Sequence, residues 1–281
     1  EAFYSENENS IYFEKFNYFL GTGKLAKYSF ENKSIKDIKT SDNIHYSYPC
    51  TFEHEGETYL IPEGAQSNKI EIYRVDQDSL KKVNTVIDGF AGVDPTIVEH
   101  NNTWYIFATD GLMGGHSYLN IFYAKNPLTE WTPHSLNPVK INLSNSRGGG
   151  SIFKEGDSLI RPAQNCFPEY GTSLVFNKIE QLSPYEFKEA VVGELKPTAN
   201  SVFKGIHTFS KNKESLVVDL KTNEFFPFAR FVTLLRARVK SDDAGLIAEN
   251  SLFKRITVIL LFLVFVILIY LFGWRALSLF V

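Results

Sequence analysis

The sequence predicts an all-β chain, a five-bladed β-propeller, followed by one C-terminal transmembrane helix. Residues 49–61 and 95–107 repeat one pattern, which is a strand, a Glu-His step, a tight turn and a second strand. The two copies start about 46 residues apart, which matches one four-stranded propeller blade. Aromatic residues make up 15% of the chain and methionine occurs once, a bias that favours β structure over a helical bundle.

The hairpins recur along the chain. In the two strongest copies the turns are Glu55-Gly56 and Asn101-Asn102, and these residues tolerate the positive φ angles that a two-residue hairpin needs. Weaker copies occupy residues 151–160 and 201–218. We expect these hairpins to provide the inner strands of successive blades.

A second element lies between the hairpins. Short apolar and aromatic segments indicate the third strands of the blades, at residues 24–30, 69–75, 119–124 and 173–179. Residues 126–133 contain two prolines, which predicts a turn into an outer strand because proline removes a ladder donor. With the N-terminal unit included, these elements predict five blades. The chain starts at Glu1 without a methionine or an apolar signal region, so we expect a processed or truncated N-terminus and an incomplete first blade.

The predicted domains are a propeller at 1–222, a basic juxtamembrane linker at 223–253, a transmembrane helix at 254–275 and a short tail at 276–281. Residues 256–272 carry no charge, and as a helix they nearly cross a hydrocarbon core. The flanking anchors are basic or aromatic, namely Lys254, Arg255, Trp274 and Arg275. Cations cluster on the propeller side, which predicts a single-pass membrane protein with a cytoplasmic propeller. Glycans on the sequons at Asn32, Asn101 or Asn142 would argue for the opposite side.

Charge and composition exclude several functions. The net charge of −3 gives no sign of a nucleic-acid-binding surface. The two cysteines, Cys50 and Cys166, are interpreted as buried thiols, although one bridge between them stays open. His54 and His100 occupy the same place in two hairpins, so we expect a structural role there and no metal site. Nothing in the sequence calls for a cofactor.

Several ordered motifs point to one family. They are Tyr46-Ser-Tyr-Pro-Cys-Thr-Phe, Val93-Asp-Pro-Thr-Ile, Arg161-Pro-Ala-Gln-Asn, Tyr170-Gly and His207-Thr. Over about residues 10–222 the chain resembles the N-terminal domain of the glucosamine inositolphosphorylceramide transferase family. The resemblance implies a five-bladed propeller related to arabinanase-type and invertase-type glycoside hydrolases. Similar domains occur beside glycosyltransferase modules.

Those hydrolases resemble one another in using three carboxylates on their inner strands, because glycoside hydrolysis needs an acid and a base or nucleophile across the scissile bond. Asp94 matches one of the three. Tyr48 and Arg147 stand where two others are expected, so two hydrolase carboxylates are missing. Asp94 and Glu63 are the candidate catalytic residues.

Other polar side chains near strand ends suit sugar binding, because amides and guanidinium groups form paired hydrogen bonds with vicinal hydroxyls or phosphate. The candidate substrate-binding residues are Tyr48, Arg147, Arg161, Gln164, Asn165, Tyr170 and His207. A structural role between blades is an equal alternative for Arg161 and Asn165, and is favoured for His207. If they form one site, Glu63, Asp94, Arg161, Gln164 and His207 should converge at one mouth of the propeller.

The leading hypothesis is a membrane-anchored, carbohydrate-handling propeller in glycoconjugate or glycolipid synthesis. It would bind a glycan or an activated sugar and assist a glycosyltransferase. The alternative is a furanosidase-like glycoside hydrolase or transglycosidase that uses Asp94 and Glu63. A protein-interaction propeller at the membrane is a third possibility. The expected partners are a carbohydrate or glycolipid ligand, the membrane and a glycosyltransferase, but no nucleic acid.

Overall fold

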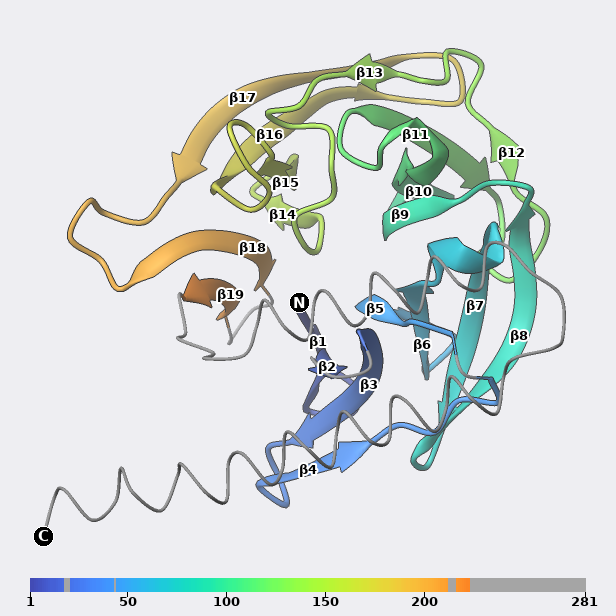
Figure 1. The fold of residues 1–281 in the computed structure, drawn as a ribbon. Coiled ribbons are helices and arrows are strands. Elements are labelled where there is room, and N and C mark those ends of the chain that lie inside the picture. The colour runs from blue at the N-terminus through green and yellow to red at the C-terminus, as the bar shows by residue number, and fades with distance from the viewer. Residues whose placement is uncertain (18–20, 43, 212–215, 223–281) are drawn as a thin grey trace, which may run out of the picture. The chain divides into compact units, whose positions relative to one another are not determined.

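The computed structural model describes residues 1–17, 21–42, 44–211 and 216–222. Their strands form five antiparallel sheets that surround a common centre (Figure 1). The predicted all-β propeller is therefore confirmed. In the described part of the chain, four sheets have four or five strands and the fifth has two.

The first two sheets are complete blades in which consecutive strands pair. The first contains β1 (Ala2–Ser5), β2 (Ser10–Asn17), β3 (Thr22–Ser29) and β4 (Ser34–Asp37). The second contains β5 (Ser47–His54), β6 (Glu57–Glu63), β7 (Lys69–Asp76) and β8 (Ser79–Asp88). The N-terminal sheet, which we expected to be incomplete, has four strands in the described residues.

The remaining sheets follow the same pattern. The third contains β9 (Gly92–His100), β10 (Thr103–Asp110), β11 (Tyr118–Ala124), β12 (Thr132–Pro133) and β13 (Lys140–Ile141). The fourth contains β14 (Phe153–Glu155), β15 (Ser158–Asn165), β16 (Ser173–Leu182) and β17 (Phe187–Leu195). The fifth contains β18 (Phe203–Lys211) and β19 (Leu216–Thr222). The predicted third strands correspond to β3, β7, β11 and β16, and the predicted outer strand is β12.

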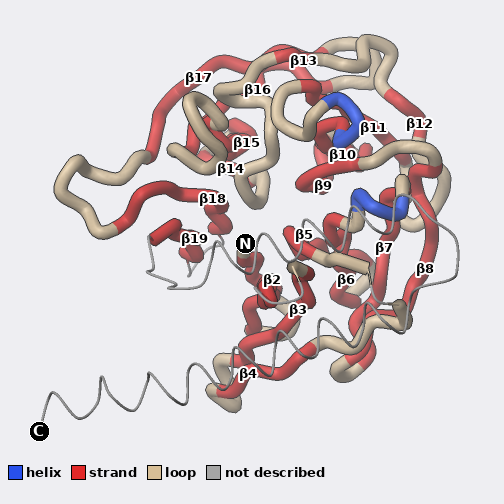
Figure 2. Tube along the Cα trace, in the orientation of Figure 1, coloured by secondary structure: helices blue, strands red, loops and turns tan. Residues whose placement is uncertain are grey.

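Helical structure in the described residues is limited to two short turns, η1 (Ala65–Ser67) and η2 (Gly111–Met113) (Figure 2). Neither is long or apolar enough to span a membrane, and the described part of the chain holds no helix that is. The predicted linker at 223–253, transmembrane helix at 254–275 and tail at 276–281 lie outside the described residues.

The repeated hairpins have the predicted turns. Glu55 and Gly56 have φ angles of 50° and 81°, and Asn101 and Asn102 have φ angles of 50° and 54°. Positive φ at both central residues is the type I′ geometry, whose twist matches that of the flanking strands. In both hairpins the register places the histidine before the turn opposite the first residue after it.

The same two repeats share an unusual backbone at their inner ends. Tyr48 and Asp94 each precede a proline, and their φ angles are 44° and 49°. A left-handed conformation is uncommon for side chains of this size and stores strain. In both sheets the strand register also shifts near this point, as at a β-bulge. The local turn re-aims both side chains relative to a regular strand.

Tyr48 joins three blades at the centre. Its side chain is fully buried, and its hydroxyl lies 2.7 Å from the Thr96 hydroxyl oxygen in β9. The same hydroxyl accepts a hydrogen bond from the Gly150 N–H (2.8 Å), just before β14. Phe3 in β1 packs edge-on against the Tyr48 ring, with ring centroids 4.7 Å apart. One phenol thus holds the inner segments of neighbouring sheets in place.

Candidate functional site

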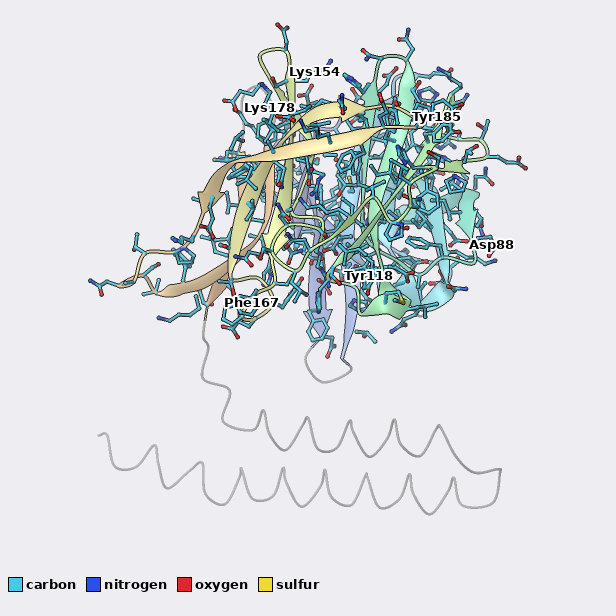
Figure 3. All side chains as sticks on the ribbon, turned by 90° about the horizontal axis from the view of Figure 1, so that it is seen from above. Asp88, Tyr118, Lys154, Phe167, Lys178 and Tyr185 are labelled. Atoms are coloured by element: carbon cyan, nitrogen blue, oxygen red, sulfur yellow. The ribbon has the colours of Figure 1, made fainter. Side chains whose placement is uncertain are left out.

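A cavity of about 480 Å³ opens near the centre of the propeller. It is lined by Glu1, Glu14, Phe16, His45, Ser47, Glu63, His116, Arg147 and Tyr170. Figure 3 shows Tyr118 and Phe167 toward one face of the propeller and Lys154 and Lys178 toward the opposite face. His116 lies in the loop just before Tyr118, and Tyr170 lies in the same loop as Phe167. These two loops therefore build part of the cavity wall.

Asp94 lies at the base of this site with a fully buried side chain. Its carboxylate accepts hydrogen bonds from Arg147 through Nε (2.7 Å to Oδ2) and Nη2 (3.4 Å to Oδ1). Gln164 Nε2 donates a further hydrogen bond to Oδ2 at 2.8 Å. Paired contacts of this kind fix the orientation of both partners. Asp94 is therefore engaged on both oxygens within the protein.

Glu63 lies directly against Asp94 and lines the cavity. Its Oε2 accepts a hydrogen bond from the Asp94 backbone N–H at 3.0 Å. Burial raises the pKa of Asp94 to about 7, although the positive charge of Arg147 opposes this rise. The charge of Glu63 and the interaction with its side chain raise the pKa of Asp94 further. Burial also raises the pKa of Glu63. The Glu63 carboxylate is thus held by the Asp94 backbone, and each carboxyl group affects the ionisation of the other.

Tyr170 covers Arg147. The centre of the guanidinium group lies 4.6 Å from the centroid of the Tyr170 ring, within cation–π distance. The Tyr170 hydroxyl donates a hydrogen bond to Glu1 Oε1 (3.1 Å), and the His207 ring packs 4.8 Å from the Tyr170 ring. Tyr170 therefore provides an aromatic wall whose polar end is held by a carboxylate.

Three predicted binding residues have mainly structural contacts. Arg161 is 2% exposed, and its guanidinium donates to both Glu189 oxygens (2.9 and 2.6 Å) and to the carbonyls of Asn145 (2.6 Å) and Ser146 (3.3 Å). Tyr48 points into the blade junction instead of lining the cavity. Asn165 Oδ1 accepts a hydrogen bond from the Phe167 N–H (3.0 Å) and closes a turn.

The predicted shared site is therefore only partly assembled. Glu63, Asp94 and Gln164 are in direct contact. His207 reaches the site through the Tyr170 ring, while its Nδ1 lies 3.5 Å from Asp219. Arg161 does not line the cavity and is directed to Glu189.

Several cavity residues are absent from the sequence predictions, and Glu14 is the most informative of them. It follows the buried residues Ser10 and Tyr12 on the same face of β2. A glutamate at an inward position of a strand is a detectable signal, because charged groups rarely face a core without a function or partner. Burial, followed by the Glu1 charge, raises the pKa of Glu14 to about 7. Glu1, Phe16, His45 and His116 carry no comparable signal.

Antiparallel sheets around a polar cavity define this molecule as a β-propeller of the type found in glycoside hydrolases. Sucrose-6-phosphate hydrolase from Lactobacillus gasseri has a similar fold, with a TM-score of 0.57 and 11% identity over 82% of this chain and 55% of that chain. The exo-β-1,3-galactanase 1,3Gal43A from Clostridium thermocellum gives a TM-score of 0.50 and 10% identity, over 72% and 52% of the two chains. At sequence identities of 10% and 11%, these similarities show the fold alone.

The family follows from the sequence. The model of the family described as glucosamine inositolphosphorylceramide transferase 1, N-terminal, matches residues 7–222, and the chain belongs to this family. The resemblance predicted from the motifs is confirmed.

Relatives named glucosamine inositolphosphorylceramide transferase 1 occur in plants. The Oryza sativa subsp. japonica protein is 33% identical over 161 residues, which is 55% of this chain and 22% of the relative. The Arabidopsis thaliana protein is 34% identical over 162 residues, which is 55% of this chain and 21% of the relative. The matched region thus covers about a fifth of the length of these curated relatives.

Proposed function

We propose that the propeller binds a glycan or an activated sugar in its central cavity and assists a glycosyltransferase in the synthesis of glycoconjugates or glycolipids. The observation that carries this proposal is the engagement of Asp94. Arg147 and Gln164 occupy its carboxylate beneath a cavity walled by carboxylates, imidazoles and aromatic rings. Such walls suit hydroxyl-rich ligands, because carboxylates accept hydrogen bonds from hydroxyls and aromatic rings cover apolar faces.

A binding role is favoured over hydrolysis by the carboxylate geometry. Glycoside hydrolases need two carboxyl groups separated by roughly 5 to 10 Å, with the scissile bond between them. Here the Glu63 carboxylate is bound to the Asp94 backbone N–H, and the Asp94 carboxylate is fully buried and engaged by Arg147 and Gln164. This arrangement supports the accessory role more than the furanosidase-like alternative.

The family name supports a place in glycolipid synthesis. The plant relatives carry a transferase name, and their length leaves most of each protein outside the matched region. A domain that holds a glycan near a separate transferase centre fits that architecture. The membrane anchor and the cytoplasmic side are proposed from the uncharged run at 256–272 and the basic residues before it.

The test of carbohydrate binding uses the full chain in detergent and saturation-transfer NMR with a panel of glycans and sugar nucleotides. Tyr170→Ala should weaken binding, and with it the transfer signal, by roughly two- to tenfold, because an aromatic contact contributes about 0.5 to 1.5 kcal/mol. Tyr185→Ala is the matched control, since Tyr185 is 71% exposed and lies toward the face opposite Phe167 (Figure 3). Equal signals for both variants, or no signal for any ligand, would overturn the proposal.

A further inference from the structure

We propose that the central cavity selects the uncharged end of a glycan and rejects phosphorylated and nucleotide-activated sugars. This inference rests on the proposed function and narrows its ligand. The propeller would then hold the acceptor or product glycan, while the activated donor binds elsewhere.

Carboxylates dominate the polar wall of the cavity. Glu1, Glu14 and Glu63 line it, and Asp94 lies beneath Glu63. Arg147 is the single lysine or arginine among the described residues that line the cavity. The Glu1 amino group is a second cation nearby, but it pairs with Asp219 at 3.0 Å. Above about pH 7, where most of the Glu14 and Asp94 carboxyl groups are ionised, the carboxylates outnumber these cations, and the low-dielectric wall strengthens the resulting negative potential.

Arg147 is not available as a phosphate clamp. Its Nε and Nη2 donate to Asp94, and its Nη1 lies 3.3 Å from the Gly115 carbonyl oxygen and 3.1 Å from His116 Nδ1. Tyr170 covers one face of the guanidinium. Recognition of a phosphate by arginine requires free N–H groups in a paired arrangement. Here four of the five N–H groups are already directed at Asp94, Gly115 and His116, and the Asp94 carboxylate faces the guanidinium charge.

The carboxyl groups already disfavour additional negative charge. Burial raises the pKa of Glu14 to about 7, and it also raises the pKa of Glu1 and Glu63, with repulsion from neighbouring carboxylates contributing to each. A phosphate group carries a charge of about −1.5 to −2 at neutral pH and would add to this repulsion. Hydroxyl groups have no such cost, and they can donate to a carboxylate or accept from a protonated one.

The cavity wall also contains aromatic rings, which suit the apolar faces of sugar rings. The Tyr170 ring forms part of the wall, and the Phe16 ring, 41% exposed, forms another part. Aromatic rings pack against the C–H faces of sugar rings while the surrounding polar groups bind the hydroxyls. An uncharged sugar unit can use both sets of contacts.

The consequence concerns the order of events in synthesis. A transfer reaction needs a donor that carries a good leaving group, commonly a nucleoside diphosphate, and an acceptor with a free hydroxyl. The charge of the cavity is compatible with the acceptor or with the glycosylated product. The diphosphate of the donor requires a cationic or metal-containing site in the transferase module.

The test compares three probe classes on the full chain in detergent by isothermal titration calorimetry. The probes are neutral methyl glycosides of common hexoses and pentoses, the matching sugar 1-phosphates and the matching uridine diphosphate sugars. At least one neutral glycoside should bind at least about tenfold more tightly than its phosphorylated counterparts, the ratio that about 1.4 kcal/mol of charge repulsion produces. Raising the salt concentration should narrow the ratio.

A charge-neutralising variant gives the second readout. Glu14→Gln/Glu63→Gln should raise affinity for the sugar 1-phosphate about tenfold. Glu57→Gln is the matched control, because Glu57 is exposed at the other end of the strand that carries Glu63 and should change nothing. Circular dichroism establishes that the variants fold, and the salt series on the unmodified chain tests the idea if they do not.

The outcomes separate the two proposals. Phosphorylated or nucleotide sugars that bind as tightly as the neutral glycosides would overturn the charge selection but leave carbohydrate binding intact. Binding of none of the probes would overturn both.

Discussion

Replacing Arg161 by methionine should destabilise the propeller strongly without touching the cavity. The guanidinium group is 2% exposed and makes two hydrogen bonds to Glu189 and two to the backbone carbonyls of Asn145 and Ser146. Breaking a buried ion pair from one side costs about 3 to 5 kcal/mol. Lys140 still reaches Glu189 Oε1 at 2.6 Å, so we expect the lower end, about 3 kcal/mol.

Urea unfolding followed by tryptophan fluorescence measures this loss. With a slope of roughly 2 to 3 kcal/mol per molar urea, the midpoint should fall by about 1 M. Lys188→Met is the matched control. Lys188 directly precedes Glu189 in the sequence, but it forms an exposed ion pair with Glu180. We expect no measurable shift for it. An Arg161→Met midpoint within error of that control would refute the structural assignment and return Arg161 to the list of candidate ligand contacts.

The same pair gives a pH signature. Burial raises the pKa of Glu189, but Arg161 and Lys140 outweigh burial and hold it below its ordinary value of 4.5. A depressed carboxyl pKa stabilises the fold above 4.5, and this contribution is lost as the pH falls through the folded-state pKa. The stability difference between the unmodified chain and Arg161→Met should therefore shrink below pH 4.5.

Four further outcomes are expected. Burial raises the pKa of Glu14 from 4.5 to about 7, so the contribution of Glu14 to stability declines as the pH rises from 4.5 to 7. Glu14→Gln should therefore raise the melting temperature at pH 8 and leave it unchanged at pH 4. Asp94→Asn and the unmodified chain should be equally inactive on aryl furanosides and pyranosides, and turnover abolished by the substitution would restore the hydrolase alternative. Gly171→Ala should lower the free energy of unfolding by about 1 to 3 kcal/mol, because the φ angle of Gly171 is 72° and a Cβ would lie 2.1 Å from the His207 ring. Gly156 is the control, since its φ angle is 58° but a Cβ there would have no neighbour within 4 Å. In the same urea assay Gly156→Ala should lower the free energy of unfolding by less. Asn32 and Asn142 are exposed sequons that should remain unglycosylated in cells, as gel mobility before and after endoglycosidase treatment would reveal, and a shift would place the propeller on the other side of the membrane.

The parts of the fold that were predictable from the sequence are those set by local chemistry. The turn pairs at Glu55-Gly56 and Asn101-Asn102 favour positive φ, and the apolar alternation around them favours strands. Their regular spacing then indicates blades without any knowledge of long-range contacts. Asp94 was identified by a different route, because the family resemblance matches it to one of the three hydrolase carboxylates.

The parts of the site that escaped prediction depend on contacts between distant blades. Arg161 and Arg147 look equally suitable for ligand binding in the sequence, yet Arg161 pairs with Glu189 on β17 and Arg147 with Asp94 on β9. Only the three-dimensional arrangement distinguishes the two. The inward position of Glu14 on β2 is a local signal, but only the arrangement of the sheets shows that this face of β2 borders the cavity.

The junction at Tyr48 has a consequence for how the molecule comes apart. Repeat proteins in which each unit touches only its neighbours can lose structure one unit at a time. Here one buried phenol is bonded to Thr96 in the third sheet and to Gly150 at the edge of the fourth, while its own backbone belongs to the second. Opening any of these sheets would expose the hydroxyl and its partners together, at the full cost of unpaired buried groups. Hydrogen exchange should therefore find these three sheets opening as one cooperative unit.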